Sequence, residues 1–83
     1  MNNKDIAINY LDAVKRPDGG YINKIGTIIW YNDEGQVHRE DGPAFIGSDI
    51  AWYFNDRSYT FDNWCIAANK TDKDKMLLRL QYE

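Results

Sequence analysis

His38 and Cys65 have the side chains most directly suited to chemistry, and each is the only residue of its type among 83. With Glu40 and Asp41 close by in the sequence, His38 has the neighbours of a general base or of a metal ligand. A zinc site, however, needs at least two further imidazole or thiolate ligands, which the sequence does not supply. The alternative is that the imidazole makes a structural hydrogen bond to a turn. We favour this alternative because His38 belongs to a repeated motif, and we predict no catalytic residue, no metal and no other cofactor.

Cys65 could act as a nucleophile only with a base beside it. It follows Trp64 on the apolar face of an expected helix, where a buried, unreactive thiol is the usual case. A single cysteine cannot form an internal disulfide, and small secreted domains usually carry several. Residues 1–13 lack the pattern of a signal peptide, and the apolar run Ile28–Tyr31 is far too short to span a bilayer. We therefore expect a protein of the reducing cytoplasm, or of the host cytoplasm if a phage encodes it.

Two acidic pairs, Asp33–Glu34 and Glu40–Asp41, form the next candidate site. They could act as paired carboxylates or as a calcium loop, but their spacing is not that of an EF-hand. Hairpin turns are commonly acidic because they are solvated, which is the interpretation we favour. If the pairs have a function, they form one acidic patch that faces a basic partner. The net charge of −3 argues against direct binding to nucleic acid or to anionic membrane.

Aromatic residues are abundant, with three Trp, six Tyr and three Phe. They could form a platform for sugars or bases, although packing in the core is the default expectation. A protein-binding face remains an alternative, since Trp and Tyr dominate interface hot spots. The candidate partner-binding residues are Trp30, Tyr31, Asp33, Glu34, Glu40, Asp41 and Tyr53.

The pattern of apolar residues and turn signals predicts a single α+β domain over residues 1–83. The spacing of Ile6, Tyr10 and Val14 predicts an N-terminal helix over residues 1–16, ended by Pro17. Residues 17–59 alternate short β-rich runs with turns, and residues 60–83 predict one or two helices. Thr71 with Asp74 resembles a capping box for the last helix. We expect a small antiparallel sheet with the helices packed on one face.

The centre of the chain contains two degenerate copies of one unit. Arg16–Ile22 aligns with Arg39–Phe45, and Ile28–Tyr31 aligns with Ile50–Tyr53. Each copy has the order Arg-x-Asp-Gly, a short apolar run, a loop, Trp-Tyr and a turn. Such self-similarity predicts two β-hairpins with their tryptophans in equivalent positions, flanked by helices that cap the pair.

The second copy carries a more specific pattern. His38–Ala44, preceded by Trp30-Tyr31 and a turn, resembles the repeat W-Y-x-N-G-x-x-H-R-x-D-G-P-A of small uncharacterised proteins from tailed bacteriophages and some bacteria, and is loosely similar to MORN-type hairpin repeats. The resemblance covers about residues 16–64. The first copy departs from it, with Gly20 and Tyr21 in place of Pro and Ala, and after the second copy Tyr59-Thr60 replaces the next His-Arg. The resemblance implies the hairpin fold and a phage-type origin.

These observations lead to an expected function without enzymatic activity. We expect a small phage-type accessory protein that binds a host or defence-system protein and modulates it sterically, for example as an anti-CRISPR or anti-restriction inhibitor. One alternative is a self-assembling structural module, such as a homodimer joined through sheet edges. Another is a small-ligand or glycan binder that uses a Trp-Tyr face.

Overall fold

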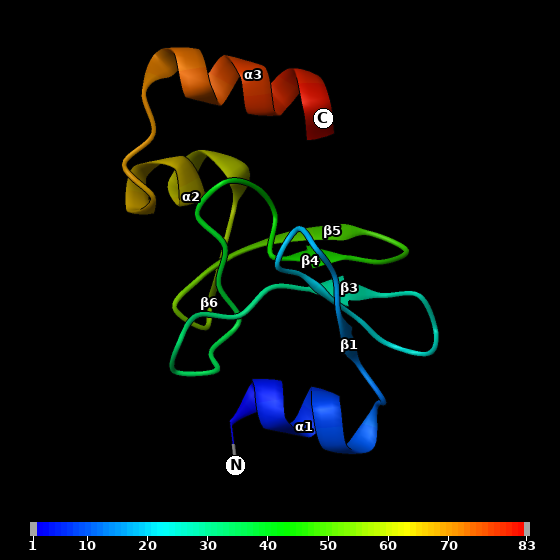
Figure 1. The fold of residues 1–83 in the computed structure, drawn as a ribbon. Coiled ribbons are helices and arrows are strands. Elements are labelled where there is room, and N and C mark those ends of the chain that lie inside the picture. The colour runs from blue at the N-terminus through cyan, green and yellow to red at the C-terminus, as the bar shows by residue number, and fades with distance from the viewer. Residues whose placement is uncertain (1, 83) are drawn as a thin grey trace.

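A computed structural model describes residues 2–82 and consists of three helices and one sheet within that range (Figure 1). The elements in chain order are α1 (Asn3–Tyr10), β1 (Val14–Lys15), β2 (Tyr21–Ile22), β3 (Ile28–Ile29), β4 (Phe45–Ile46), β5 (Ile50–Phe54), β6 (Arg57–Tyr59), α2 (Phe61–Ala67) and α3 (Asp72–Tyr82). All neighbouring strands pair antiparallel in the order β1-β2-β3-β4-β5-β6, so the sheet is a meander. The predicted α+β fold with an antiparallel sheet and flanking helices is confirmed.

The first helix is shorter than its apolar spacing predicted. Asn2 caps it by accepting a hydrogen bond from the backbone of Asp5, and it ends at Tyr10 instead of continuing to residue 16. Asp12 then takes a left-handed conformation with φ of 55°. Val14, which the periodicity assigned to the helix, belongs to β1. The prediction was wrong because the backbone of this segment pairs with β2, and that pairing outweighs a weak helical pattern.

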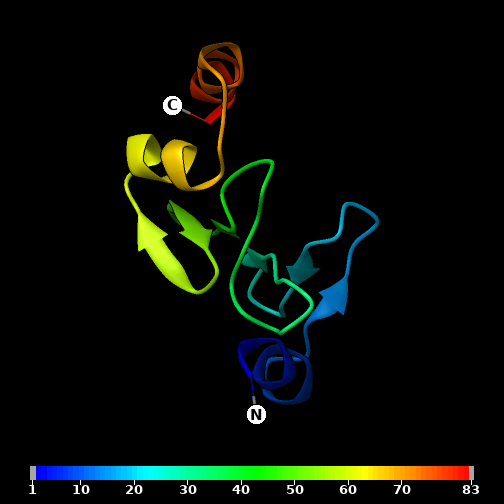
Figure 2. The same cartoon turned by 90° about the vertical axis from the view of Figure 1, so that its left-hand side faces the viewer.

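The helices also lie on both sides of the sheet, which corrects the expectation that they would pack on one face. Figures 1 and 2 show α1 at one end of the molecule and α2 and α3 at the other. The cause is the alternation of side chains along β5. Trp52 points toward α2 and packs on Trp64, whereas Tyr53 lines a groove together with Ala7 of α1. A Trp-Tyr pair on one strand thus gives each side of the sheet an aromatic ring to cover.

The core lies between the sheet and the two C-terminal helices. Its members are apolar and buried, namely Trp52, Phe61, Trp64, Cys65 and Leu78. The ring of Trp52 lies 4.7 Å from that of Trp64 and 4.8 Å from that of Phe61, measured between centroids. Thr60 caps α2, and the predicted capping box of α3 forms, with Thr71 and Asp74 exchanging hydrogen bonds.

The two copies of the sequence unit place their tryptophans at matching points of two hairpins. Each tryptophan lies two residues after the isoleucine that begins a strand: Trp30 comes two residues after Ile28 of β3, and Trp52 two residues after Ile50 of β5. Both rings are buried, Trp30 with 8% and Trp52 with 6% of its surface exposed. Their positions in the hairpins are therefore equivalent.

What covers the two rings differs between the copies. The guanidinium of Arg39, from the loop of the next copy, lies 3.8 Å from the centroid of Trp30. No third copy follows Trp52, and rings of α2, Phe61 and Trp64, cover it instead. Helix α2 thus takes the place that the Arg-x-Asp-Gly loop of a further repeat would occupy.

The sheet register shifts the predicted alignment of the copies by one residue. Tyr21 pairs with Ile29, and the corresponding pair in the second hairpin is Phe45 with Ala51. Tyr21 therefore corresponds to Phe45, whereas the alignment of the two sequence copies paired it with Ala44. The second copy has one more residue than the first between its Asp-Gly turn and the strand.

Candidate functional site

Only part of the predicted partner-binding set is accessible. Trp30 is buried beneath Arg39, so it cannot form a binding face. Tyr31 and Tyr53 are half-buried and lie on the side of the sheet that faces α1. The structure therefore brings the two tyrosines together and removes the tryptophan from the candidate site.

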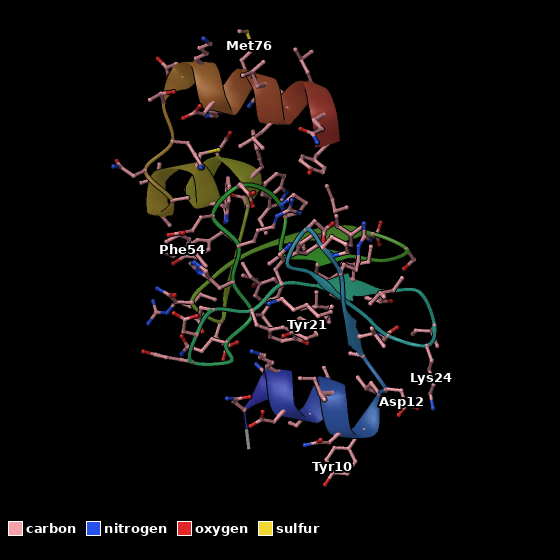
Figure 3. All side chains as sticks on the ribbon, viewed as in Figure 1. Tyr10, Asp12, Tyr21, Lys24, Phe54 and Met76 are labelled. Carbon is pink, nitrogen blue, oxygen red and sulfur yellow. The ribbon has the colours of Figure 1, made fainter. Side chains whose placement is uncertain are left out.

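A groove separates α1 from the sheet at these tyrosines. It is open on one side and has a volume of about 400 Å³. Figure 3 shows Tyr21 on the α1 side of the sheet and Tyr10 on the outer side of the helix, pointing away from the sheet. We call this feature the α1 groove; its lining residues are Asn3, Ile6, Ala7, Leu11, Ile29, Tyr31, Val37, Phe45, Tyr53 and Asp56.

Asp56 is the charged residue of the α1 groove, and its sequence pattern did not indicate a place in the site. It forms the two-residue turn between β5 and β6 with Asn55, and the two have φ values of 71° and 50°. A type I′ hairpin turn needs positive φ at both central residues, which Asn and Asp tolerate. The carboxylate Oδ1 accepts hydrogen bonds from the backbone of Val37 and the side chain of Asn3, both at 2.8 Å. The signal for this position was the Asn-Asp pair between two β-rich runs.

The turn at residues 32–35 holds the N-terminal end of α1. The backbone N–H of Lys4 donates to the carbonyl of Gly35, and the Asn2 side chain donates to the carbonyl of Glu34. Gly35 has φ of 77°, and an added Cβ there would collide with Asn2. Asp33 and Glu34 are exposed on this turn and line a second, separate hollow together with Asn55, the residue before Asp56 in the chain.

The two acidic pairs do not form one patch. Asp33 and Glu34 lie on the turn that contacts the N-terminal end of α1 through Asn2 and Lys4. Asp41 instead lies beside Lys70 and Asp74, at the end formed by α2 and α3. Between the two turns the chain runs along the sheet, where Val37 bridges Tyr31 and the backbone N–H of Arg39 donates to the carbonyl of Tyr53.

His38 has the structural role that we favoured from the sequence. Its Nδ1 accepts a hydrogen bond of 3.0 Å from the backbone N–H of Asn55, in the β5–β6 turn. Its ring packs on Phe54 at 4.4 Å between centroids. The Glu40 carboxylate lies 3.9 Å from Nε2, on the solvent side. The imidazole therefore joins the loop of the second copy to the next turn.

The remaining titratable candidates have structural surroundings. Cys65 is buried in the core, and this burial raises the pKa of its thiol. Burial also raises the pKa of the Tyr31 phenol, and Tyr21, whose ring is 5.7 Å away, adds to this effect. Within residues 2–82 no group of three His, Cys, Asp or Glu side chains is arranged to hold a metal ion.

A second surface feature is a row of aliphatic side chains on the opposite side of the sheet from α1. Successive cross-strand pairs place them side by side over five strands. Val14 at the sheet edge is 66% exposed, Ile50 at the other end is 36% exposed, and the members between them are half-buried. The aliphatic row consists of Val14, Ile22, Ile28, Ile46 and Ile50.

Comparison of the chain with protein-family models, with curated proteins and with solved structures finds no match. None of the helices in residues 2–82 combines the length and apolar character needed to cross a membrane.

Proposed function

We propose that this chain is a small protein without enzymatic activity that binds a partner protein and covers part of the partner's surface. The binding face consists of Tyr31 and Tyr53 at the α1 groove with the neighbouring acidic turn of Asp33 and Glu34. The observation that carries the proposal is that Tyr31 and Tyr53, 22 positions apart in the sequence, line one groove, and that the turn with Asp33 and Glu34 follows Tyr31 directly in the chain.

The two parts of this face have different physical roles. Half-buried tyrosines offer rigid apolar area and a hydroxyl group, which suits an interface hot spot. The exposed carboxylates of Asp33 and Glu34 are rim charges, which mainly set the association rate and its salt dependence. A partner with a basic surface fits this combination. Together with the resemblance to phage-type repeats, it supports a host or defence-system protein, for example a CRISPR or restriction component, as the partner.

Capture from a bacterial host lysate with the tagged chain, followed by mass spectrometry, would identify the partner. The binding rates of the purified pair then test the face. The double variant Asp33→Asn, Glu34→Gln should slow association at low salt, and about 1 M salt should reduce the difference because the Debye length falls to about 3 Å. Tyr53→Ala should speed dissociation by a factor that salt changes little.

The chain offers a matched control at its other end. The double variant Glu40→Gln, Asp41→Asn makes the same change in net charge near α2 and α3. If this control slowed association as much as the double variant of the 32–35 turn does, general charge would explain the effect and the proposed face would be wrong.

Self-association is the second candidate function, and the aliphatic row is the observation that favours it. A contiguous apolar row that reaches an exposed edge strand is typical of surfaces that pair with another copy. Sedimentation of the purified chain without a partner distinguishes the two functions. An oligomer that forms with rising concentration and is lost in Val14→Lys would support self-association, whereas a monomer at all concentrations would exclude it.

A further inference from the structure

We propose that the α1 groove is a binding site for a small organic cation, an ammonium group carried on an aromatic or branched aliphatic body. This inference goes beyond the proposed function because it concerns a free small molecule and not a partner protein. It rests on the size of the groove, on the apolar and aromatic residues of its walls, and on the hydrogen bonding of Asp56, the carboxylate among its lining residues.

The size of the groove fits a molecule larger than one amino-acid side chain. Its volume of about 400 Å³ falls in the range of roughly 300–1,000 Å³ that small-molecule sites occupy. Most of its wall is apolar: Ile6 contributes from α1 and Leu11 from the cap that follows it, and Ile29 and Phe45 contribute from the sheet. Such walls favour a hydrophobic body and exclude a ligand that is polar over its whole surface.

The polar end of the groove favours a cation. Asp56 uses Oδ1 for the hydrogen bonds from Val37 and Asn3, and within residues 2–82 no hydrogen bond or ion pair occupies its Oδ2. The two bonds and the hairpin turn fix the carboxylate in place, so little conformational freedom is lost when a ligand binds. An ammonium group at Oδ2 would form a charge-assisted hydrogen bond.

Tyrosine rings in the wall of the groove strengthen the preference for positive charge. Tyr31 and Tyr53 both line the α1 groove, and the face of a tyrosine ring attracts a cation within about 6 Å. The chain already shows this interaction next to the groove, because the ammonium of Lys4 lies 5.5 Å from the centroid of the Tyr21 ring. Lys4 makes this contact at the neighbouring ring and forms no ion pair with Asp56.

The test is a titration of the full chain by ¹H–¹⁵N NMR with two probes of similar size and opposite charge, tryptamine and indole-3-propionate. We expect tryptamine to shift the backbone amides of Tyr31, Val37 and Asp56, and to bind at least ten-fold more tightly than the carboxylate probe. Equal binding of the two probes, or shifts confined to other parts of the chain, would overturn the proposal. This comparison uses the unmodified protein, so it does not depend on the stability of a variant.

Two variants with the same change in charge locate the site. Asp56→Asn keeps an oxygen that can accept from Val37 and Asn3 but removes the charge, so tryptamine should bind about ten-fold more weakly. Asp49→Asn, an exposed position between β4 and β5 and outside the groove lining, should leave tryptamine binding within two-fold of the unmodified chain. A larger effect at Asp49 than at Asp56 would contradict the assignment.

A third probe separates a free amine from the lysine of a partner protein. Nα-acetyl-lysine methylamide has the ammonium group but lacks the aromatic body, so we expect it to bind at least ten-fold more weakly than tryptamine. If it bound as tightly, the site would recognise a lysine side chain and the small-molecule proposal would be wrong. Loss of partner capture alone would affect the proposed function and not this result.

Discussion

Replacing Arg39 by methionine should destabilise the fold far more than the same replacement at Arg16, the matching residue of the first copy. The Arg39 guanidinium lies on Trp30 at 3.8 Å, and its Nη1 donates to the carbonyl of Pro43 at 3.1 Å. Its Nε donates to Asp41 at 2.8 Å, and the side chain is only 13% exposed. Methionine retains much of the apolar stem and removes all three interactions.

The magnitude follows from these contacts. Loss of the cation–π contact with Trp30 costs about 1 kcal/mol. Pro43 is fully buried, so leaving its carbonyl without a donor costs about 1–3 kcal/mol. The carboxylate of Asp41 is 82% exposed, and its ion pair contributes little. The expected loss for Arg39→Met is therefore about 2–4 kcal/mol in the free energy of unfolding.

Arg16→Met is the matched control. Arg16 pairs with Asp18 at 3.0 Å, and both side chains are well exposed, at 38% and 42%. Removing such a pair costs about 0–1 kcal/mol.

Urea unfolding followed by tryptophan fluorescence gives the free energy of both variants. In a domain of this size, 1 kcal/mol corresponds to a shift of roughly 4–8 °C in Tm. Equal losses in the two variants would refute the argument that burial and the contact with Trp30 distinguish the second copy from the first.

Four further changes test other parts of the structure. Gly20→Ala should lower stability by about 1–3 kcal/mol and alter the near-UV circular dichroism, because a Cβ would lie 2.8 Å from the Trp30 ring. Gly26→Ala is its control: Gly26 has φ of 91° and open space around it, so this variant should add backbone strain without the spectral change. His38→Gln should lower the free energy of unfolding by about 1 kcal/mol more than His38→Asn does, because the asparagine side chain keeps an acceptor near the position of Nδ1. Equal values for the two variants would contradict the role of that hydrogen bond. Because burial raises the pKa of Tyr31, its proton is held more tightly in the folded state, so stability should fall as pH rises above about 10, with a shallower slope in Tyr31→Phe. Thr71→Ala should cost about 1 kcal/mol through loss of the α3 cap, measured by thermal unfolding, and an unchanged Tm would remove the capping box as a source of stability.

Several features of the fold were predictable because short stretches of sequence encode them. The capping box of Thr71 and Asp74 depends on residues within one helical turn, and it forms as its sequence pattern indicates. The hydrogen bond between His38 and a turn followed from its place in the repeated motif. Burial of Cys65 followed from its apolar helical neighbours.

The candidate site was only half predictable. Tyr31 and Tyr53 were identified from the repeated Trp-Tyr pair, and alternation along a strand places each tyrosine on the opposite side from its tryptophan. The sequence did not indicate which side would remain open, so Trp30 was wrongly included. Asp56 was missed because its importance comes from Val37 and Asn3, which lie 19 and 53 positions away.

By itself, the sequence determined the class of fold, the repeated hairpin unit and the capping box of the last helix, since each depends on residues close together in the chain. Only the tertiary structure decided where the first helix ends, which side of the sheet each helix covers and that the acidic turns lie apart. Those outcomes depend on contacts beyond neighbouring residues, such as the pairing of Val14 with Ile22 and the backbone hydrogen bond between Lys4 and the distant Gly35. The physical reason is that local preferences differ by less than about 1 kcal/mol per residue, so sheet pairing and burial between distant segments override them.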